Sequence, residues 1–236
     1  MSDLDVSNVH VDPLGWLFVF VIGVLMPAAV ISSARRAKPA VKGHQKITKR
    51  LRSVAILVSL AAVALIVARR DNIMLFPAFE WTPRLIVLST GVLVGVVALA
   101  EGLLIVRSPE QRRELWARQI IPDNNSERAV WLVSATVAGA TEEIIFRGVF
   151  FALLAAITGS VAAAAGVSAI VFALAHYRQG WKSMAFIAPI ALVFQWLVIY
   201  SGSLVPAIIV HAVYNVVRGL RASWSYHEEL DEVSHL

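Results

Sequence analysis

Two adjacent carboxylates and one arginine interrupt an otherwise apolar run from Ala129 to Gly159: Glu142, Glu143 and Arg147. A charged side chain in a membrane helix costs at least ~2.5 kcal/mol, so this cluster indicates a functional site. Helical residues four apart share a face, so Glu143 and Arg147 can neutralise each other, while Glu142 points elsewhere. Glu142 is therefore the candidate general base, because apolar surroundings favour that role for a carboxylate.

Three further polar residues lie in or beside apolar segments, namely His176, His211 and Asn215. His211 and Asn215 are four residues apart, so both can donate hydrogen bonds to one oxygen. Amide hydrolysis requires a carboxylate that takes a proton from water, an imidazole that orients the water, and donors for the developing oxyanion. The sequence supplies all of these, and with no cysteine it supplies no thiolate nucleophile.

Composition identifies an integral membrane protein. Of 236 residues, 58% are hydrophobic, far above the share in a soluble domain. The net charge of +5 does not indicate nucleic-acid binding, because the Lys and Arg residues gather between the apolar runs, where they orient a membrane protein. The expected surroundings are therefore membrane lipids, with no nucleic-acid partner.

Seven apolar segments predict an all-α, polytopic bundle of seven to eight membrane helices. They are Leu14–Ile31, Val54–Ala68, Leu85–Val106, Ala129–Gly159, Ser160–His176, Ser183–Tyr200 and Leu204–Leu220. The fourth is longer than one span needs, which predicts tilt, a break near Gly139 or a lead-in along the inner surface. We favour the lead-in. This run or the amphipathic segment Gln111–Ile121 can supply an eighth helix.

The segment from Arg35 to Arg52 carries many basic residues and no acid, which places it in the cytoplasm, the N-terminus outside and the C-terminus inside. We expect one domain with three parts: an N-terminal three-helix region (1–128), helices that carry the site (129–220) and an acidic polar tail (221–236). His227 and His235 in that tail are expected to be solvated. Glu101 is expected to reach the inner surface or pair with Arg107, or else to join a site.

Three motifs in order carry a family resemblance. Glu142-Glu143 with Arg147 matches EExxxR, Phe172 with His176 matches FxxxH, and His211 with Asn215 matches HxxxN. In this order and spacing the chain resembles the CPBP family of intramembrane proteases, which includes the type II CAAX prenyl endopeptidases and the bacterial Abi or bacteriocin-processing proteins. The resemblance covers roughly residues 129–219.

The resemblance implies an intramembrane endopeptidase of a bacterial or archaeal cell membrane, with a cavity that opens to the cytoplasm and cleavage near the membrane surface. It implies that Glu142 and His176 activate the water and that His211 and Asn215 form the oxyanion hole. Glu143 and Arg147 would hold the geometry, with Phe172 in support.

Zinc is an alternative, since Glu142, His176 and His211 are possible metal ligands around an open water position. The spacing does not decide, because no HExxH motif is present and the three candidates lie on different helices. We favour the metal-free mechanism with no cofactor.

Two other classes of function remain open. A proton-coupled transporter also uses membrane-embedded Glu, His and Arg, but the sequence shows no internal symmetry of the kind that transporters carry. A non-catalytic membrane adaptor or immunity protein can keep the same fold. The expected substrate is a peptide or a membrane protein, and no residue indicates whether it is lipidated.

Overall fold

The structure is a computed structural model that describes residues 9–35, 44–108, 110–112, 122 and 124–234. The described residues are almost entirely helical and contain no strand. The elements are α1 (Pro13–Phe20), the π-helical η1 (Val21–Leu25), α2 (Met26–Ala34), α3 (His44–Arg70), α4 (Pro83–Ile105), α6 (Asn125–Glu142), the π-helical η2 (Glu143–Phe150), α7 (Phe151–Thr158), α8 (Val161–Ala175), the 3-10 turn η3 (Tyr177–Gln179), α9 (Trp181–Ser201) and α10 (Leu204–Ser234).

The helix ends follow from local sequence. Asp12, Thr82, Asn124 and Ser160 each precede a helix and accept a hydrogen bond from a backbone N–H of its first turn. Gly159 ends α7 with φ of 64°, a left-handed conformation that only glycine adopts without strain. These signals place the boundaries of most predicted segments within a few residues of their expected positions.

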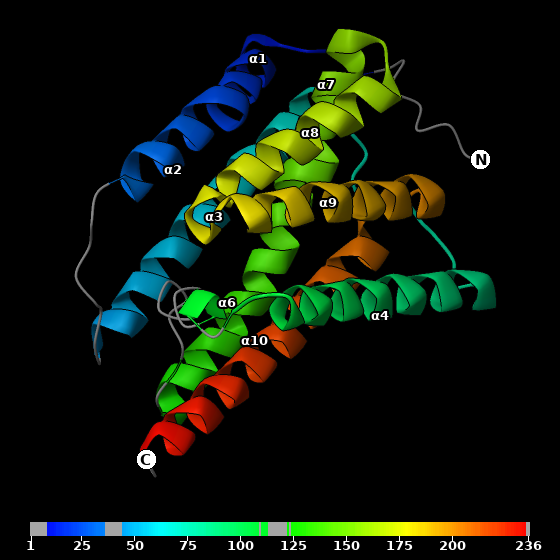
Figure 1. Ribbon diagram of the computed structural model, residues 1–236. Coiled ribbons are helices and arrows are strands. Elements are labelled where there is room, and N and C mark those ends of the chain that lie inside the picture. Colours follow the sequence, from blue (N-terminus) through cyan, green and yellow to red (C-terminus); the bar gives the residue numbers. More distant parts are fainter. Residues whose placement is uncertain (1–8, 36–43, 109, 113–121, 123, 235–236) are drawn as a thin grey trace.

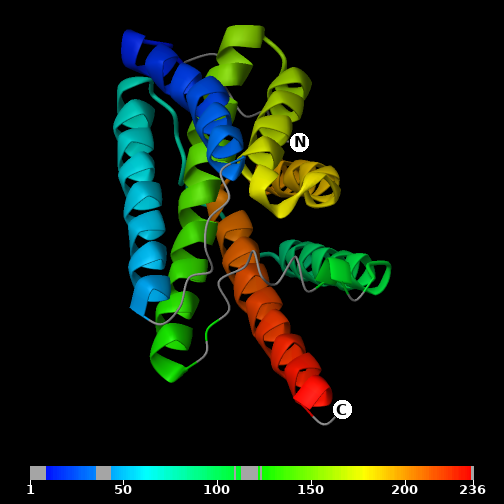
Figure 2. The ribbon, with the colours of Figure 1, turned by 60° about the vertical axis from the view of Figure 1, so that its left-hand side comes forward.

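Helix α6 forms the centre of the bundle. Figures 1 and 2 show α3 and α6 side by side along the long axis of the molecule, with α10 crossing α6 and with α4 and α9 running across the bundle. The most deeply buried large side chains gather around η2 and its neighbours, among them Phe150, Phe151, Phe194 and Leu204. The predicted motif segment is therefore the core of the fold.

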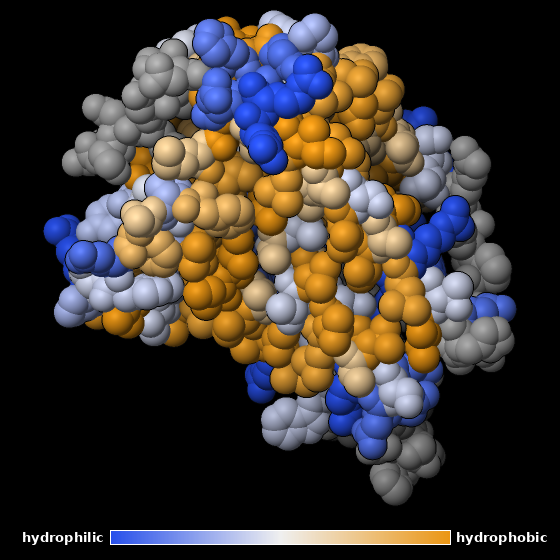
Figure 3. All heavy atoms as spheres, turned by 180° about the vertical axis from the view of Figure 1, so that it is seen from behind, coloured by the Kyte–Doolittle hydropathy of each residue, from blue (hydrophilic) through white to orange (hydrophobic). Residues whose placement is uncertain are grey.

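Five helical stretches are long and apolar enough to cross a membrane: Pro13–Ala34, Gln45–Arg70, Pro83–Ile105, Trp181–Ser201 and Leu204–Arg221. On the face shown in Figure 3, a broad apolar surface lies between polar regions at the upper and lower ends. On α4, for example, Val87 and Val94 are exposed. An uncovered apolar surface of this extent is what a lipid-facing protein presents, so the chain is an integral membrane protein.

Two boundaries differ clearly from the sequence predictions. Helix α3 begins at His44, well before Val54, because the basic segment ahead of the apolar run consists of good helix formers. Its residue Lys46 reaches Glu127 on α6, with 3.7 Å between Nζ and Oε2. Helix α10 continues past Leu220 to Ser234 for the same reason of helix propensity, so the acidic tail is largely helical.

The long fourth run is one continuous helical stretch from Asn125 to Thr158, with no break near Gly139. Its irregularity comes later, at η2, where the backbone is π-helical. Most of the alternative eighth element, Gln111–Ile121, lies outside the described residues.

Candidate active site

Glu143 is the most enclosed of the predicted site residues, with 0% exposure. Its Oε1 lies 3.2 Å from Nη1 of Arg147, so the two form the pair expected from their spacing. The same oxygen accepts a hydrogen bond of 2.6 Å from Nδ1 of His211 on α10. Glu143 therefore joins its own helical run to α10 and also balances a buried guanidinium.

The bond from Glu143 determines the orientation of the His211 ring. An ionised carboxylate can only accept, so Nδ1 carries a proton and Nε2 faces the other way. That nitrogen lies 3.7 Å from Oε2 of Glu142. The separation exceeds a hydrogen bond and leaves the two groups close enough to share a third polar atom, such as a water oxygen. The side chain of Glu142 is 17% exposed, so it is the more accessible of the two carboxylates.

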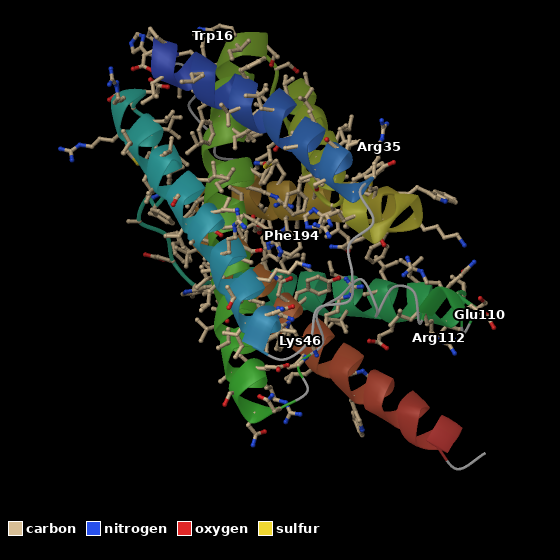
Figure 4. The ribbon with its side chains drawn as sticks, turned by 90° about the vertical axis from the view of Figure 1, so that its left-hand side faces the viewer. Trp16, Arg35, Lys46, Glu110, Arg112 and Phe194 are labelled. Atoms are coloured by element: carbon tan, nitrogen blue, oxygen red, sulfur yellow. The ribbon has the colours of Figure 1, made fainter. Side chains whose placement is uncertain are left out.

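Aromatic rings enclose the charged pair. The guanidinium carbon of Arg147 lies 3.9 Å from the centre of the Phe172 ring and 5.8 Å from that of Phe194. The Phe194 ring lies 5.2 Å from the ring of His211. Figure 4 places Phe194 at the centre of the bundle. Sequence reasoning did not select Phe194, because a phenylalanine in an apolar helix carries no signal that separates it from ordinary packing.

His176 follows the last residue of α8 and is half-buried. Its Nδ1 lies 2.8 Å from the carbonyl oxygen of Phe172, one turn earlier, and the two rings are 4.6 Å apart. The Phe172 ring also lies 6.3 Å from the His211 ring, so this phenylalanine contacts both histidines. No ion pair joins His176 to Glu142 in the described part of the chain, whereas such a contact does join Glu142 to His211.

Asn215 lies one turn after His211 on α10 and faces α6. Its Nδ2 donates to the carbonyl oxygen of Ala135 at 3.2 Å. A primary amide has two N–H groups, so one donor remains for another acceptor. The close approach of α6 and α10 depends on Gly139, where an added Cβ would lie 2.9 Å from the backbone nitrogen of Ala212.

The local backbone at the motif is unusual. Segment η2, which includes Glu143 and Arg147, is π-helical, a rare conformation that is frequent at functional sites. Ser168 on α8 donates to the carbonyl oxygen of Phe146 at 3.0 Å and is buried, so it fastens α8 to this segment. Neither the π-helical backbone nor the role of Ser168 has a signal in the sequence.

The residues proposed for zinc do not form a metal site in this arrangement. Within the described residues no group of three or more His, Cys, Asp or Glu side chains is placed to hold a metal ion. We therefore derive no step through a metal.

Residues 124–217 match the Rce1-like family model, whose description is type II CAAX prenyl endopeptidase Rce1-like. The matched range begins at the residue that caps α6 and includes all three motifs. Neither the curated proteins nor the solved structures gave a match to this chain. At family level, the match supports a CAAX-protease-like intramembrane endopeptidase. Over residues 124–217 the chain is thus similar to the Rce1-like family, which is consistent with the CPBP family.

Proposed function

We propose that this protein is an intramembrane endopeptidase that hydrolyses a peptide bond with a water molecule activated by Glu142. The observation that carries the proposal is the approach of two adjacent carboxylates to one histidine, His211, inside the Rce1-like domain. In this arrangement Arg147 and His211 both engage Oε1 of Glu143, and Glu142 is left to act on a substrate.

The reaction proceeds in two proton transfers. Glu142 takes a proton from water as the water oxygen bonds to the carbonyl carbon of the substrate, and the electron pair of the carbonyl moves onto its oxygen. The free N–H of Asn215 and Nε2 of His211, when protonated, donate to that oxyanion. Glu142 then passes its proton to the amide nitrogen as the C–N bond breaks. His176 is assigned to orient the water.

The supporting residues have a separate task. Arg147 balances the charge of Glu143, and Phe172 covers the guanidinium on one side. With His211 held by Glu143, its second nitrogen keeps one direction during the reaction. This is the preorganisation that oxyanion stabilisation requires, because donors that are already aligned need no reorganisation when charge develops.

The remaining parts of the proposal concern the setting. We assign the protein to a bacterial or archaeal cell membrane, with seven to eight membrane helices, the N-terminus outside, the C-terminus in the cytoplasm and the site cavity open to the cytoplasm. The chain is treated as one domain whose site is carried by residues 129–220. The substrate is a peptide or a membrane protein, with or without a lipid group, and the reaction uses no metal or other cofactor.

Comparative peptidomics tests the proposal. Cells that carry the wild type are compared with cells that carry Glu142→Gln, which keeps the shape of the side chain and removes the base. Uncleaved substrate is expected to accumulate only with Glu142→Gln. The matched control is Glu101→Gln, which changes a glutamate on α4 that pairs with Arg221. Identical peptide profiles for the wild type and Glu142→Gln would reject hydrolysis and favour an adaptor.

A further inference from the structure

Arg107 is a buried arginine without an acidic partner. It follows the end of α4 and is 7% exposed. Its Nη2 donates to Ser183 Oγ at 3.2 Å, and no carboxylate of the described residues forms an ion pair with it. The sequence suggested Glu101 as a partner, but Glu101 pairs with Arg221, 3.2 Å from Nη2 to Oε2. A buried charge without a counter-charge is costly, so this arrangement calls for an anion.

A second guanidinium adds to the same positive region. Burial lowers the pKa of Arg107 from its ordinary value, and the nearby charge of Arg218 on α10 lowers it further. Two like charges in one place repel each other in the absence of an anion between them. Arg218 also has no hydrogen bond or ion pair within the described residues. The geometry agrees, because Glu101 near the end of α4 lies 3.2 Å from Arg221, which follows Arg218 by one turn of α10. Arg107 and Arg218 therefore form a cationic site near the contact of α4 with α10.

Ser183 holds Arg107 in position. Its hydroxyl donates to the carbonyl oxygen of Gln179 at 2.9 Å, so the oxygen is left to accept from Arg107. Nε and Nη1 of Arg107 have no hydrogen-bond partner in the described part of the chain. They are not among the polar atoms that are both fully buried and without a partner. These donors therefore keep some exposure and remain available to a ligand. Ser183 lies in the first turn of α9, where the helix dipole adds positive potential.

Several residues that flank Arg107 and Ser183 in the chain are apolar and exposed. Ile105 is 79% exposed, Val106 is 75% exposed and Trp181 is 71% exposed. Exposed Trp beside basic residues is typical of the membrane–water interface. Nη1 of Arg112 donates to the carbonyl oxygen of Arg107, so the two arginines lie close together. Figure 4 shows Arg112 near the level of Lys46 and far from Trp16. That is the end of the molecule where the basic segment predicts the cytoplasm.

We propose that Arg107 and Arg218, with Ser183 in support, bind the phosphate of an anionic phospholipid headgroup. The exposed Ile105, Val106 and Trp181 would then contact the lipid chains and the interface. Basic pockets between membrane helices on the cytoplasmic side are suited to such lipids, and that leaflet is rich in them. A free peptide carboxylate is also an anion, but the exposed apolar side chains of Ile105, Val106 and Trp181 favour a lipid. The site is independent of the proposed peptidase activity.

Lipid binding to the purified full-length chain in neutral detergent tests this site. Native mass spectrometry measures the bound fraction of phosphatidylglycerol and of phosphatidylcholine. We expect the wild type to retain phosphatidylglycerol about tenfold better or more, because two cations act on its net charge. Arg218→Gln should lose most of that preference. Arg221→Gln is the matched control, since it changes an arginine on the same helix whose charge Glu101 already balances, and it should keep the preference.

Further arms distinguish the sources of the anion. Arg107→Lys keeps the buried positive charge and removes the guanidinium, so it tests the geometry of phosphate binding. Phosphatidylglycerol retention should weaken, while the melting temperature stays near that of the wild type. Inorganic phosphate and a short alanine–leucine peptide with a free carboxylate are added as competitors. Equal retention of both lipids, an unchanged preference in Arg218→Gln, or displacement of the lipid by the peptide at equal concentration would overturn the proposal. None of these measurements requires hydrolysis.

Discussion

Glu143 and His211 are joined by a hydrogen bond of 2.6 Å between Oε1 and Nδ1, across the interface of η2 and α10. This bond brings together two motifs that are 68 residues apart in the chain. It also assigns the proton on His211 to Nδ1, so the other nitrogen faces Glu142. The relation makes Glu143 a positioning residue, whose effect on any reaction passes through His211 and Arg147.

Glu143→Gln should destabilise the protein. The change leaves the buried Arg147 without a counter-charge, which costs about 3–5 kcal/mol of unfolding free energy. Chemical denaturation in detergent measures the loss. Glu101→Gln is the control, because Glu101 and Arg221 are partly exposed and such a pair contributes less than about 1 kcal/mol. Equal stability of the two variants would show that Glu143 does not balance Arg147.

The two histidines should respond differently to substitution by asparagine. His211→Asn removes the donor to a buried carboxylate, so both the unfolding free energy and peptide cleavage should fall, the former by about 1–3 kcal/mol. His176→Asn should leave stability nearly unchanged and slow cleavage about a hundredfold or more if His176 orients the water. The readouts are melting temperature and cleavage of a peptide found by the peptidome comparison. Full cleavage by His176→Asn would remove that residue from the mechanism.

Gly139→Ala should separate α6 from α10. The new Cβ would lie 2.9 Å from the backbone of Ala212, next to His211, and backbone cannot move aside as a side chain can. A loss of about 1–3 kcal/mol is expected from this overpacking, together with slower cleavage. Gly95→Ala on α4 is the control. No atom lies within 4 Å of its added Cβ, so it should be neutral or stabilising. Equal effects of the two would indicate that the helices are not in close contact at Gly139.

Asp71→Asn should raise stability at neutral pH. Asp71 is 0% exposed, its Oδ2 has no partner, and burial raises its pKa above the ordinary 3.8. Its neighbours are Asp12 and Arg70, which form an ion pair of 2.8 Å. A raised carboxyl pKa means that the folded state is favoured below pH 3.8 and loses that advantage as pH rises through the folded value.

The asparagine variant does not titrate at this position. Its melting temperature should therefore exceed that of the wild type at pH 7, and the difference should shrink as the pH falls toward 3.8. Melting curves at several pH values measure the difference. A constant difference over that range would mean that the surroundings of Asp71 already compensate for the charge of its carboxylate.

The local sequence pattern was sufficient to predict much of the fold. Apolar runs identified the helices, because a membrane leaves the backbone few other ways to satisfy its hydrogen bonds. The spacing of Glu143 and Arg147 placed them as an ion pair, since residues four apart on one helix are neighbours whatever surrounds them. The ends of α3 and α10 were missed because polar residues with good helix propensity extend a helix beyond its apolar part.

Contacts between helices were decided only by the tertiary structure. The sequence assigned Glu142, His176, His211 and Asn215 to one site. It did not show that Glu142 lies beside His211 or that Asn215 donates a hydrogen bond to Ala135. It also gave Arg107 as one of several alternatives for Glu101, whereas the structure pairs Glu101 with Arg221. The physical reason is that periodicity defines which residues share a face of one helix. The rotation and register of that helix against its neighbours depend on packing, such as Gly139 against Ala212.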